Sequence, residues 1–262
     1  MIFGYTHQGS GLGDQLMRYI TVRTLAESKG YEWGMYGWEH FKGDFFPNIS
    51  VGSPVESNME YAPFREKDVR ENGVDIRSYD PEINFVTDWT QMDGSFEDDK
   101  YWRHNLANIA KWLAVEPVEV PDTTCFIGFR GGEYYADPNL GLPFEYYNEA
   151  IWNVMVKADP IKYQVHTDDP QLARNMFTNP MFEIVDNKPI SHSKHTNMGF
   201  NWRSARCAKY AIIPNSAFFI LPRILKHHED PTAVTIAPRY WARRNTKGPW
   251  RPATYYPEFT YV

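Results

Sequence analysis

Short apolar segments alternate with helix-patterned segments along most of the chain, and this alternation restricts the fold more than any other feature. The apolar run at residues 1–6 precedes a stretch at 14–29 in which apolar residues recur every three or four positions, and Gly30 ends that stretch. A second strand is predicted at residues 31–37. Because strands that are joined by helices form parallel sheets, we predict an α/β fold with parallel sheets.

The same alternation returns in the second half, after a weaker stretch between about residues 43 and 121 that holds one helix-like segment, HNLANIAKWLAV. It predicts strands at 123–129, 162–167, 182–186, 211–214 and 233–238, and helices at 143–157, 169–177, 202–210 and 216–227, the last kinked by Pro222. The stretch VEPVEVPD is typical of a crossing between domains. We therefore predict two domains, residues 1–120 and residues 121–262.

The charge balance argues against several classes of partner. The chain has 27 lysines and arginines and 33 aspartates and glutamates, a net charge of -6, which disfavours broad binding to nucleic acid or anionic membranes. No apolar run reaches the roughly 18 residues that span a bilayer, and the N-terminus lacks a secretory pattern. We expect a cytoplasmic protein with no stable membrane insertion and no nucleic-acid partner, whose Cys125 and Cys207 are reduced.

Ligands of parallel sheets bind in the loops that follow the carboxyl ends of the strands, so these loops hold the candidate site residues. The first loop, HQGSGLGDQ, contains Gly9, Gly11 and Gly13, but Asp14 stands where a dinucleotide fingerprint needs its third glycine. The segment is not a P-loop either, because it lacks the GK[ST] sequence. Asp14 by itself is typical of a first helical turn, where a carboxylate interacts favourably with the helix dipole.

A second loop follows the strand at 123–129 and reads FRGGEYYADPNLGLP. It places Arg130 directly at the strand end, where a planar guanidinium could bind a diphosphate with two hydrogen bonds. The alternative is an ion pair with Glu133 or another carboxylate. The position of Arg130 at a strand end favours the functional interpretation.

Two further loops carry polar residues at helix starts. HTDDP places Asp168 and Asp169 where a strand ends and a helix begins, and such carboxylates bind a metal, accept hydrogen bonds from a nucleobase or cap the helix. PNSAFF places Asn215 and Ser216 at another helix start, where they would cap the helix or bind phosphate. Capping is the commonest role of residues in these positions.

Taken in order, these segments resemble those of the alpha-1,2-fucosyltransferases, glycosyltransferase family 11. GSGLGDQLMRYITVRTLAESKG resembles the family's GGLGNQLFQYAFARALA-type opening, and FIGFRGGEYYADPNLGLPFEYYNEAI resembles its HxRRGDY segment and LPxxYY helix. HTDDP resembles its SDD segment, CAKYAIIPNSAFFILPRIL its IIxNSTFSWWxAWL segment, and IAPRYW its APxxW ending. The resemblance holds in order from about residue 2 to residue 241, with little pattern between residues 43 and 121.

The resemblance implies a GT-B architecture, in which two Rossmann-like domains face a cleft, with the acceptor mostly on the N-terminal domain and the nucleotide-sugar mostly on the C-terminal one. It implies an inverting, metal-independent transfer of a sugar, with fucose from GDP-fucose as the first expectation, to a hydroxyl of a glycan acceptor. No cofactor other than the donor substrate is expected.

The resemblance also implies roles for residues. Arg130 would stabilise the charge that grows on the leaving phosphate, and Asp14 or Glu133 would accept the acceptor's proton. The donor site would comprise two segments, Thr167, Asp168 and Asp169 near the nucleobase, and Asn215, Ser216 and Ala217 at a helix N-terminus. Gly11, Gly13 and Asp14 would shape the turn beneath the reacting sugar.

The chain departs from the family pattern at several of these positions. Gly128 stands in place of the family's histidine, Gly131 in place of its second arginine, Glu133 in place of its aspartate and Asp14 in place of an asparagine, while Phe219-Ile220 replace its tryptophan-bearing stretch. Sugar transfer is therefore a firmer expectation than the identity of the sugar.

Three other functions are compatible with parts of the sequence. A catalytically inactive nucleotide- or glycan-binding module would explain the lost histidine and arginine. An NAD-dependent oxidoreductase is supported only by GSGLG and by Glu39 near the end of the second predicted strand. A zinc hydrolase would have to use His192 and His195, or the pair His227 and His228.

Overall fold

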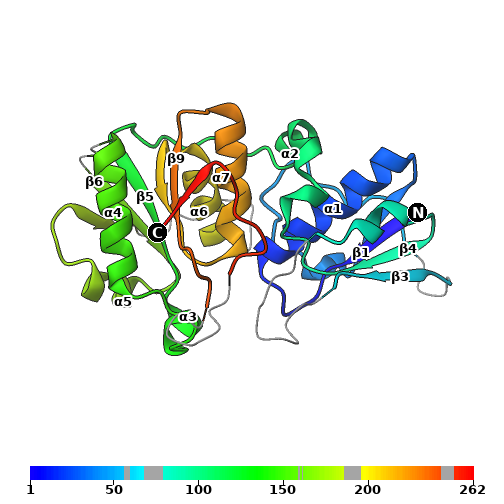
Figure 1. Cartoon of the computed structure of the whole chain (residues 1–262), viewed down its shortest axis with the longest axis horizontal. Coiled ribbons are helices and arrows are strands. Elements are labelled where there is room, and N and C mark those ends of the chain that lie inside the picture. Colours follow the sequence, from blue (N-terminus) through cyan, green and yellow to red (C-terminus); the bar gives the residue numbers. More distant parts are fainter. Residues whose placement is uncertain (56–59, 68–78, 159, 161, 186–195, 243–250) are drawn as a thin grey trace. The chain divides into compact units, whose positions relative to one another are not determined.

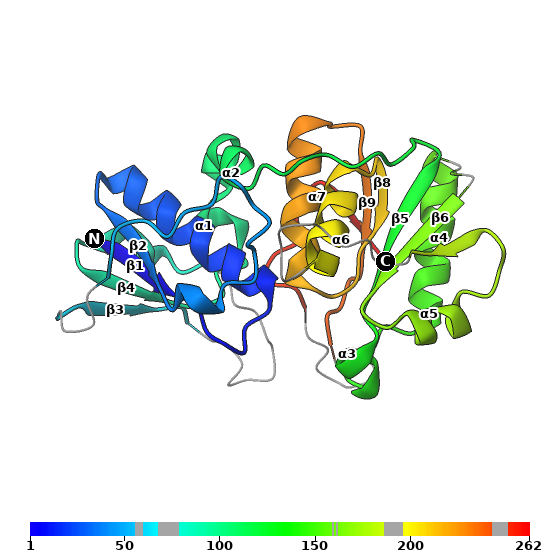
Figure 2. The same ribbon diagram turned by 180° about the vertical axis from the view of Figure 1, so that it is seen from behind.

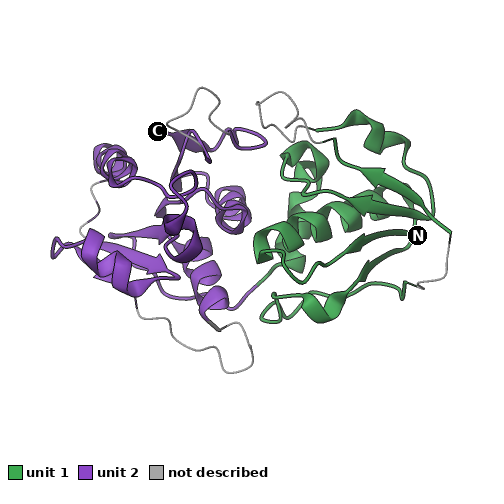
Figure 3. Cartoon of the chain, turned by 90° about the horizontal axis from the view of Figure 1, so that it is seen from below, with its two compact units in different colours: residues 1–114 green, residues 115–262 purple. Residues whose placement is uncertain are grey.

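The chain forms two compact units, residues 1–114 and residues 115–262 (Figure 3). The computed structural model describes residues 1–55, 60–67, 79–158, 160, 162–185, 196–242 and 251–262. The division falls at the first residue of VEPVEVPD, within the stretch that the sequence marks as a crossing. Each unit contains its own parallel β-sheet, which confirms the predicted α/β fold with parallel sheets.

The sheet of the first unit has the strand order β2-β1-β4-β3, and every pairing is parallel. Its strands are β1 (Ile2–Tyr5), β2 (Trp33–Tyr36), β3 (Ala62–Arg65) and β4 (Thr90–Asp93). The helices are α1 (Leu12–Lys29) and α2 (Leu106–Trp112), with short 3-10 helices η1 (Trp38–His40), η3 (Pro81–Phe85), η4 (Asp99–Tyr101) and η5 (Arg103–Asn105). The edge strand β3 contains Pro63, which is compatible with an edge because proline cannot donate to a neighbouring strand.

Helix α1 forms because its apolar positions recur at helical spacing and are buried against β1 and β2. Leu16, Ile20 and Val22 are fully buried, and burying a side chain of this size stabilises a fold by about 1.5–3 kcal/mol. The helix ends at Gly30, whose φ of 69° requires a residue without a Cβ, and whose N–H bonds to the carbonyls of Ala26 and Glu27. The helix begins at Leu12, slightly before the start that the sequence predicts.

The sheet of the second unit has the order β10-β9-β8-β5-β6-β7, again with parallel pairings. Numbered along the unit and read from β7, this order is 3-2-1-4-5-6, the order of dinucleotide-binding Rossmann folds. The strands are β5 (Thr124–Phe129), β6 (Lys162–Thr167), β7 (Phe182–Ile184), β8 (Tyr210–Ile212), β9 (Val234–Ala237) and β10 (Phe259–Tyr261). The second unit is therefore Rossmann-like.

Helices cover both faces of this second sheet. The helices of this unit are α3 (Gly132–Ala136), α4 (Phe144–Ala158), α5 (Pro170–Met176), α6 (Thr196–Cys207) and α7 (Ala217–Glu229), and α3 is a short helix in the loop after β5. Figures 1 and 2 show α4 and α5 on one face and α6 and α7 on the other. The main core lies between the sheet and α4, where the buried residues include Cys125, Ile127, Tyr147, Val154 and Val165.

The structure differs from the predicted elements at helix α6 and at the strands β3 and β4. Helix α6 begins at Thr196 and ends at Cys207, so Tyr210, predicted to be helical, instead starts β8. The region around residues 43–121 contains β3 and β4, which the sequence does not predict because both strands have only four residues, β3 contains a proline and β4 is mostly polar. Pro222 lies inside helix α7, where the sequence places it. Among the described residues, no helix is both long enough and apolar enough to span a bilayer.

Candidate functional site

The second sheet has a topological switch point between β5 and β8. These strands are neighbours, but the chain leaves β5 towards β6 on one side and leaves β8 towards β9 on the other. In open α/β sheets, ligands bind beyond the carboxyl ends of the strands at such a point. Arg130 directly follows β5, and Asn215 and Ser216 follow β8. The strand order thus brings two of the sequence-predicted segments to the position where this fold binds ligands.

Arg130 is held by contacts on two sides. Its Nη1 lies 3.1 Å from Oδ2 of Asp168, and its guanidinium carbon lies 4.6 Å from the centre of the Tyr134 ring. The side chain is 30% exposed, yet its Nε is buried and has no hydrogen-bond partner within the described structure. Gly131 donates its backbone N–H to Oδ1 of the same Asp168, at 2.7 Å. The alternative that the sequence left open for Arg130, an ion pair with Glu133 or another carboxylate, is therefore present, and its partner is Asp168.

The two glycines that depart from the family pattern stand where a side chain has no room. A Cβ on Gly128 would lie 2.7 Å from Cδ of Pro214, and a Cβ on Gly131 would lie 2.4 Å from Cβ of Asp169. Both distances are far below an ordinary carbon contact of about 3.5–4.0 Å. The chain therefore excludes the histidine and the second arginine by packing, and a single arginine remains in this loop.

Asp169 caps a helix, which is the common role of an aspartate in this position. Its Oδ1 accepts the N–H of Leu172 at 3.0 Å in the first turn of α5, and its own N–H donates to Oγ1 of Thr167 at 2.9 Å. Thr167 is buried at the end of β6. The structure thus gives each aspartate of HTDDP a protein partner, Leu172 for Asp169 and Arg130 with Gly131 for Asp168.

The segment after β8 contains a buried asparagine that is hydrogen-bonded to two loops, followed by a helix start without a side-chain cap. Asn215 is buried, and its Nδ2 donates to the carbonyls of Leu140 at 2.8 Å and Trp241 at 2.5 Å, which connects the two flanking loops. Ser216 stands at the N-cap of α7 but its side chain makes no capping hydrogen bond, and Ala217 begins the helix. The N-terminal N–H groups of a helix favour an anion, so this start is compatible with a phosphate.

Glu133 lies in the first turn of the short helix α3 with its side chain exposed. Across the described ranges no ion pair or hydrogen bond is recorded for its carboxylate, so the structure brings Arg130 together with Asp168 and not with Glu133.

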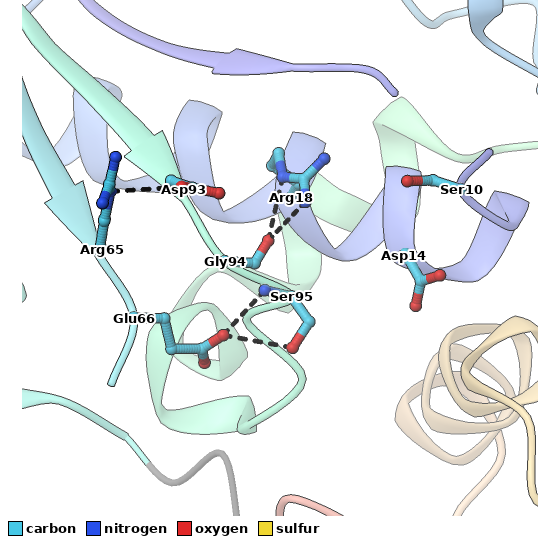
Figure 4. A pocket seen from close by; sticks show the side chains of 8 residues that line it. All are labelled: Ser10, Asp14, Arg18, Arg65, Glu66, Asp93, Gly94 and Ser95. Carbon is cyan, nitrogen blue, oxygen red and sulfur yellow. Dashed lines mark hydrogen bonds and ion pairs between the residues drawn. The ribbon is translucent and has the colours of Figure 1, made fainter. Parts of the chain in front are cut away.

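The first unit contains a polar cavity of about 330 Å³ at the carboxyl edge of its sheet (Figure 4). It is lined by Ser10, Asp14 and Arg18 from α1 and the loop before it, by Arg65 and Glu66 at the end of β3, and by Asp93, Gly94 and Ser95 at the end of β4. Of the predicted site residues, Asp14 lines this cavity, while Gly11 is the N-cap of α1 and Gly13 lies in its first turn. The cavity lies where β1 and β4 are neighbours in the sheet.

Two charged side chains give this cavity its shape. Buried Arg18 donates to the carbonyl of Tyr5, which ends β1, and twice to the carbonyl of Gly94, which follows β4, at 3.0 Å and 2.8 Å. Glu66 Oε2 accepts the N–H of Ser95 at 2.8 Å and that of Phe96 at 3.0 Å. Sequence reasoning missed both residues because it did not predict β3 and β4, whose carboxyl ends would have pointed to them.

The remaining candidate functions gain little from the structure. His227 is a core histidine whose Nε2 lies 2.9 Å from Oγ1 of Thr235, and burial lowers its pKa to about 4. His192 and His195 lie outside the described residues. Glu39 lies in η1 with its side chain 74% exposed. In the parts of the chain that the structure describes, no group of three or more His, Cys, Asp or Glu side chains could hold a metal ion.

The dinucleotide interpretation meets a further obstacle. The Rossmann strand order belongs to the second unit, whose first loop reads FRGGEYYA and lacks the G-x-G-x-x-G pattern, whereas GSGLG lies in the first unit. Comparison with known proteins adds no family: no protein-family model matches the chain, and no curated protein matches it.

Proposed function

We propose that the chain is an inverting glycosyltransferase with a GT-B architecture, in which the second unit binds a nucleotide-sugar and the first unit binds a glycan acceptor. The single observation that carries the proposal is Arg130, a partly exposed guanidinium at the carboxyl end of β5, beside the switch point of a sheet with Rossmann strand order. The resemblance to glycosyltransferase family 11 makes a GDP-linked sugar, with fucose first, the donor to test.

The chemistry assigns a distinct task to each group. The acceptor oxygen forms a bond to the anomeric carbon from the face opposite the leaving group, while the bond from that carbon to the phosphate oxygen breaks and the nucleoside diphosphate leaves with the electron pair. Arg130 and the uncapped start of α7 would stabilise the negative charge that grows on the phosphate. The acceptor proton would go to Asp14 or to Glu133.

Polar residues in the cavity of the first unit support acceptor binding there. Carboxylates, arginines and serine hydroxyls converge on it from the ends of β3 and β4 and from α1, a set of donors and acceptors that matches sugar hydroxyls. Asp14 is the proposed base that lies in this cavity, and Glu133 is the proposed base in the second unit. Replacing each carboxylate by its amide tests them, and unchanged turnover in both variants would exclude the two.

The experiment that tests the donor site is calorimetric binding of GDP, UDP, ADP and dTDP to the wild type, with and without Mg²⁺. We expect one of the four to bind selectively and without Mg²⁺, and Arg130→Ala to weaken that binding at least tenfold. Lys162→Ala is the matched control, since Lys162 is a 53% exposed cation on the opposite, amino end of the same sheet. Absence of binding by all four nucleotides would refute the proposed donor site.

A catalytically inactive binding module remains the second candidate, because packing at Gly128 and Gly131 excludes two polar groups that the resembling family carries. Selective nucleotide binding without transfer or hydrolysis of the matching nucleotide-sugar would favour it.

A further inference from the structure

We propose that Asp168 is a positioning residue that fixes the guanidinium of Arg130 beyond the carboxyl end of β5. The inference rests on the proposed function for its consequence in catalysis, but the contact itself is a property of the unliganded chain. It assigns to Asp168 a role other than the nucleobase contact expected from the sequence.

The two carboxylate oxygens of Asp168 contact different partners. Oδ1 accepts the backbone N–H of Gly131 at 2.7 Å, and Oδ2 lies 3.1 Å from Nη1 of Arg130. Phe129 and Thr167 form the last pair of the β5–β6 ladder, so Arg130 and Asp168 come directly after it on neighbouring strands. Asp168 therefore continues the connection between the two strands beyond their ladder, and through it holds both the backbone and the side chain of the β5 loop.

Tyr134 provides the second contact to the Arg130 guanidinium. The Arg130 guanidinium carbon lies 4.6 Å from the centre of the Tyr134 ring, a distance typical of cation–π contact. The guanidinium thus has an aromatic ring and a carboxylate as neighbours. Its buried Nε has no hydrogen-bond partner in the described ranges.

Stability does not account for this ion pair. Arg130 is 30% exposed and Asp168 is 37% exposed, and pairs with this exposure contribute little to the free energy of unfolding because water screens them. The negative charge of Asp168 also offsets part of the positive charge that Arg130 offers to an anion. The main effect of the pair is therefore on geometry, since it orients a flexible side chain before the ligand arrives. Packing at Gly131 leaves no second arginine in the loop, so the orientation of this one arginine matters more.

The direct test measures rotation of the Arg130 guanidinium by NMR on the ¹⁵N-labelled full chain, with its signals assigned by their loss in Arg130→Ala. We expect slow rotation about the Cζ–Nη bonds in the wild type, compared with exposed Arg239 as an internal reference. Asp168→Asn retains a single carbonyl oxygen, which cannot serve both partners, so we expect rotation at least tenfold faster there.

Asp137→Asn is the matched control. It removes the same charge from the loop after α3, where the carboxylate of Asp137 accepts the N–H of Asn139 and no contact with Arg130 is recorded among the described residues. We expect wild-type rotation in this variant. Rotation of Arg130 as fast as that of Arg239 in the wild type would overturn the proposal without any variant, as would equal rates in the wild type and Asp168→Asn.

The catalytic consequence has its own readout. With the nucleotide-sugar that matches the selected nucleotide, we expect Asp168→Asn to lower kcat about 10- to 100-fold, since misplacing a positioned group costs up to this much. We expect KM to change less than about threefold, because lost orientation is offset by the loss of a negative charge near an anion. An unchanged kcat would overturn the catalytic role. If the wild type binds no nucleotide, the proposed function fails, while the rotation measurement still decides the contact.

Discussion

Replacing Gly128 by alanine tests whether packing excludes a side chain from this position in β5. The added Cβ would lie 2.7 Å from Cδ of Pro214 and 3.2 Å from two atoms of the Phe219 ring. The first distance is about 0.8 Å shorter than the lower limit of a favourable carbon contact, about 3.5 Å. The Phe219 ring can rotate, but the ring of Pro214 is rigid and follows β8, so β5 or β8 has to move.

Overpacking of this kind costs about 1–3 kcal/mol. We expect Gly128→Ala to lower the free energy of unfolding of the second unit by this amount, and the melting temperature by about 3 °C for each kcal/mol in a unit of this size. Urea titration followed by tryptophan fluorescence measures the effect. Gly141→Ala is the control within the same unit, because its Cβ would make only contacts of 3.4 Å or longer.

A double-mutant cycle with Pro214→Ala separates the clash from other causes. Removing the proline Cδ relieves the shortest contact, so we expect the double variant to recover at least about 1 kcal/mol relative to the sum of the single changes. Full additivity, or a Gly128→Ala protein within about 0.5 kcal/mol of the wild type, would refute the steric explanation for the missing histidine.

Three further predictions concern buried polar groups. Arg18→Met leaves its carbonyl acceptors without the charged donor that connects β1 and β4, so we expect the first unit to lose about 2–4 kcal/mol in a urea titration. Burial lowers the pKa of both His166 and His227 to about 4. Since this lies below the usual value of about 6.5, the stability from each neutral ring is full above pH 6.5 and is lost as pH falls towards 4, about 3 kcal/mol per histidine. Urea midpoints measured across this range should fall less in His166→Gln/His227→Gln. Burial raises the pKa of the Cys125 thiol, so iodoacetamide at pH 8 should modify it only after unfolding, and rapid labelling of the native protein would contradict its burial.

Five of the six strands of the second unit could be predicted, and the central ones most closely because they are buried on both faces, whereas the sequence does not predict the edge strand β10. β5 is buried along its whole length and reads as a continuous apolar run, and β6 has the bounds that the sequence indicates. β3 and β4 in the first unit are only four residues long, and neither APFR, which contains a proline, nor TQMD, which is mostly polar, shows a clear strand pattern. Their position is set by pairing with β1 and with each other, contacts that join distant parts of the chain and leave no local pattern.

The same distinction applies to the candidate site. The position of Arg130 at a strand end and the capping role of Asp169 follow from local sequence, and the structure shows both. The ion-pair partner of Arg130 does not follow from local sequence, because the choice between Glu133 and another carboxylate such as Asp168 depends on the register of β5 and β6. The sequence likewise does not show why position 131 needs a glycine. A Cβ there would meet Asp169, which lies in the loop after β6 and is distant in the sequence.

Strand order is the step that turns separate loops into a candidate site. Arg130 follows β5 and Asn215 follows β8, and only the pairing of Cys125, Phe126 and Ile127 with Tyr210, Ala211 and Ile212 makes these loops neighbours. Had β8 been added beside β7 instead, the loops after β5 and β8 would lie three strands apart on the sheet's carboxyl edge. The turn HQGSGLGDQ has the corresponding position in the first unit, where pairing of β1 with β4 brings Asp14 and Ser95 to one cavity. Each unit therefore gathers polar loop residues at the carboxyl edge of its own sheet, the edge at which parallel sheets bind ligands.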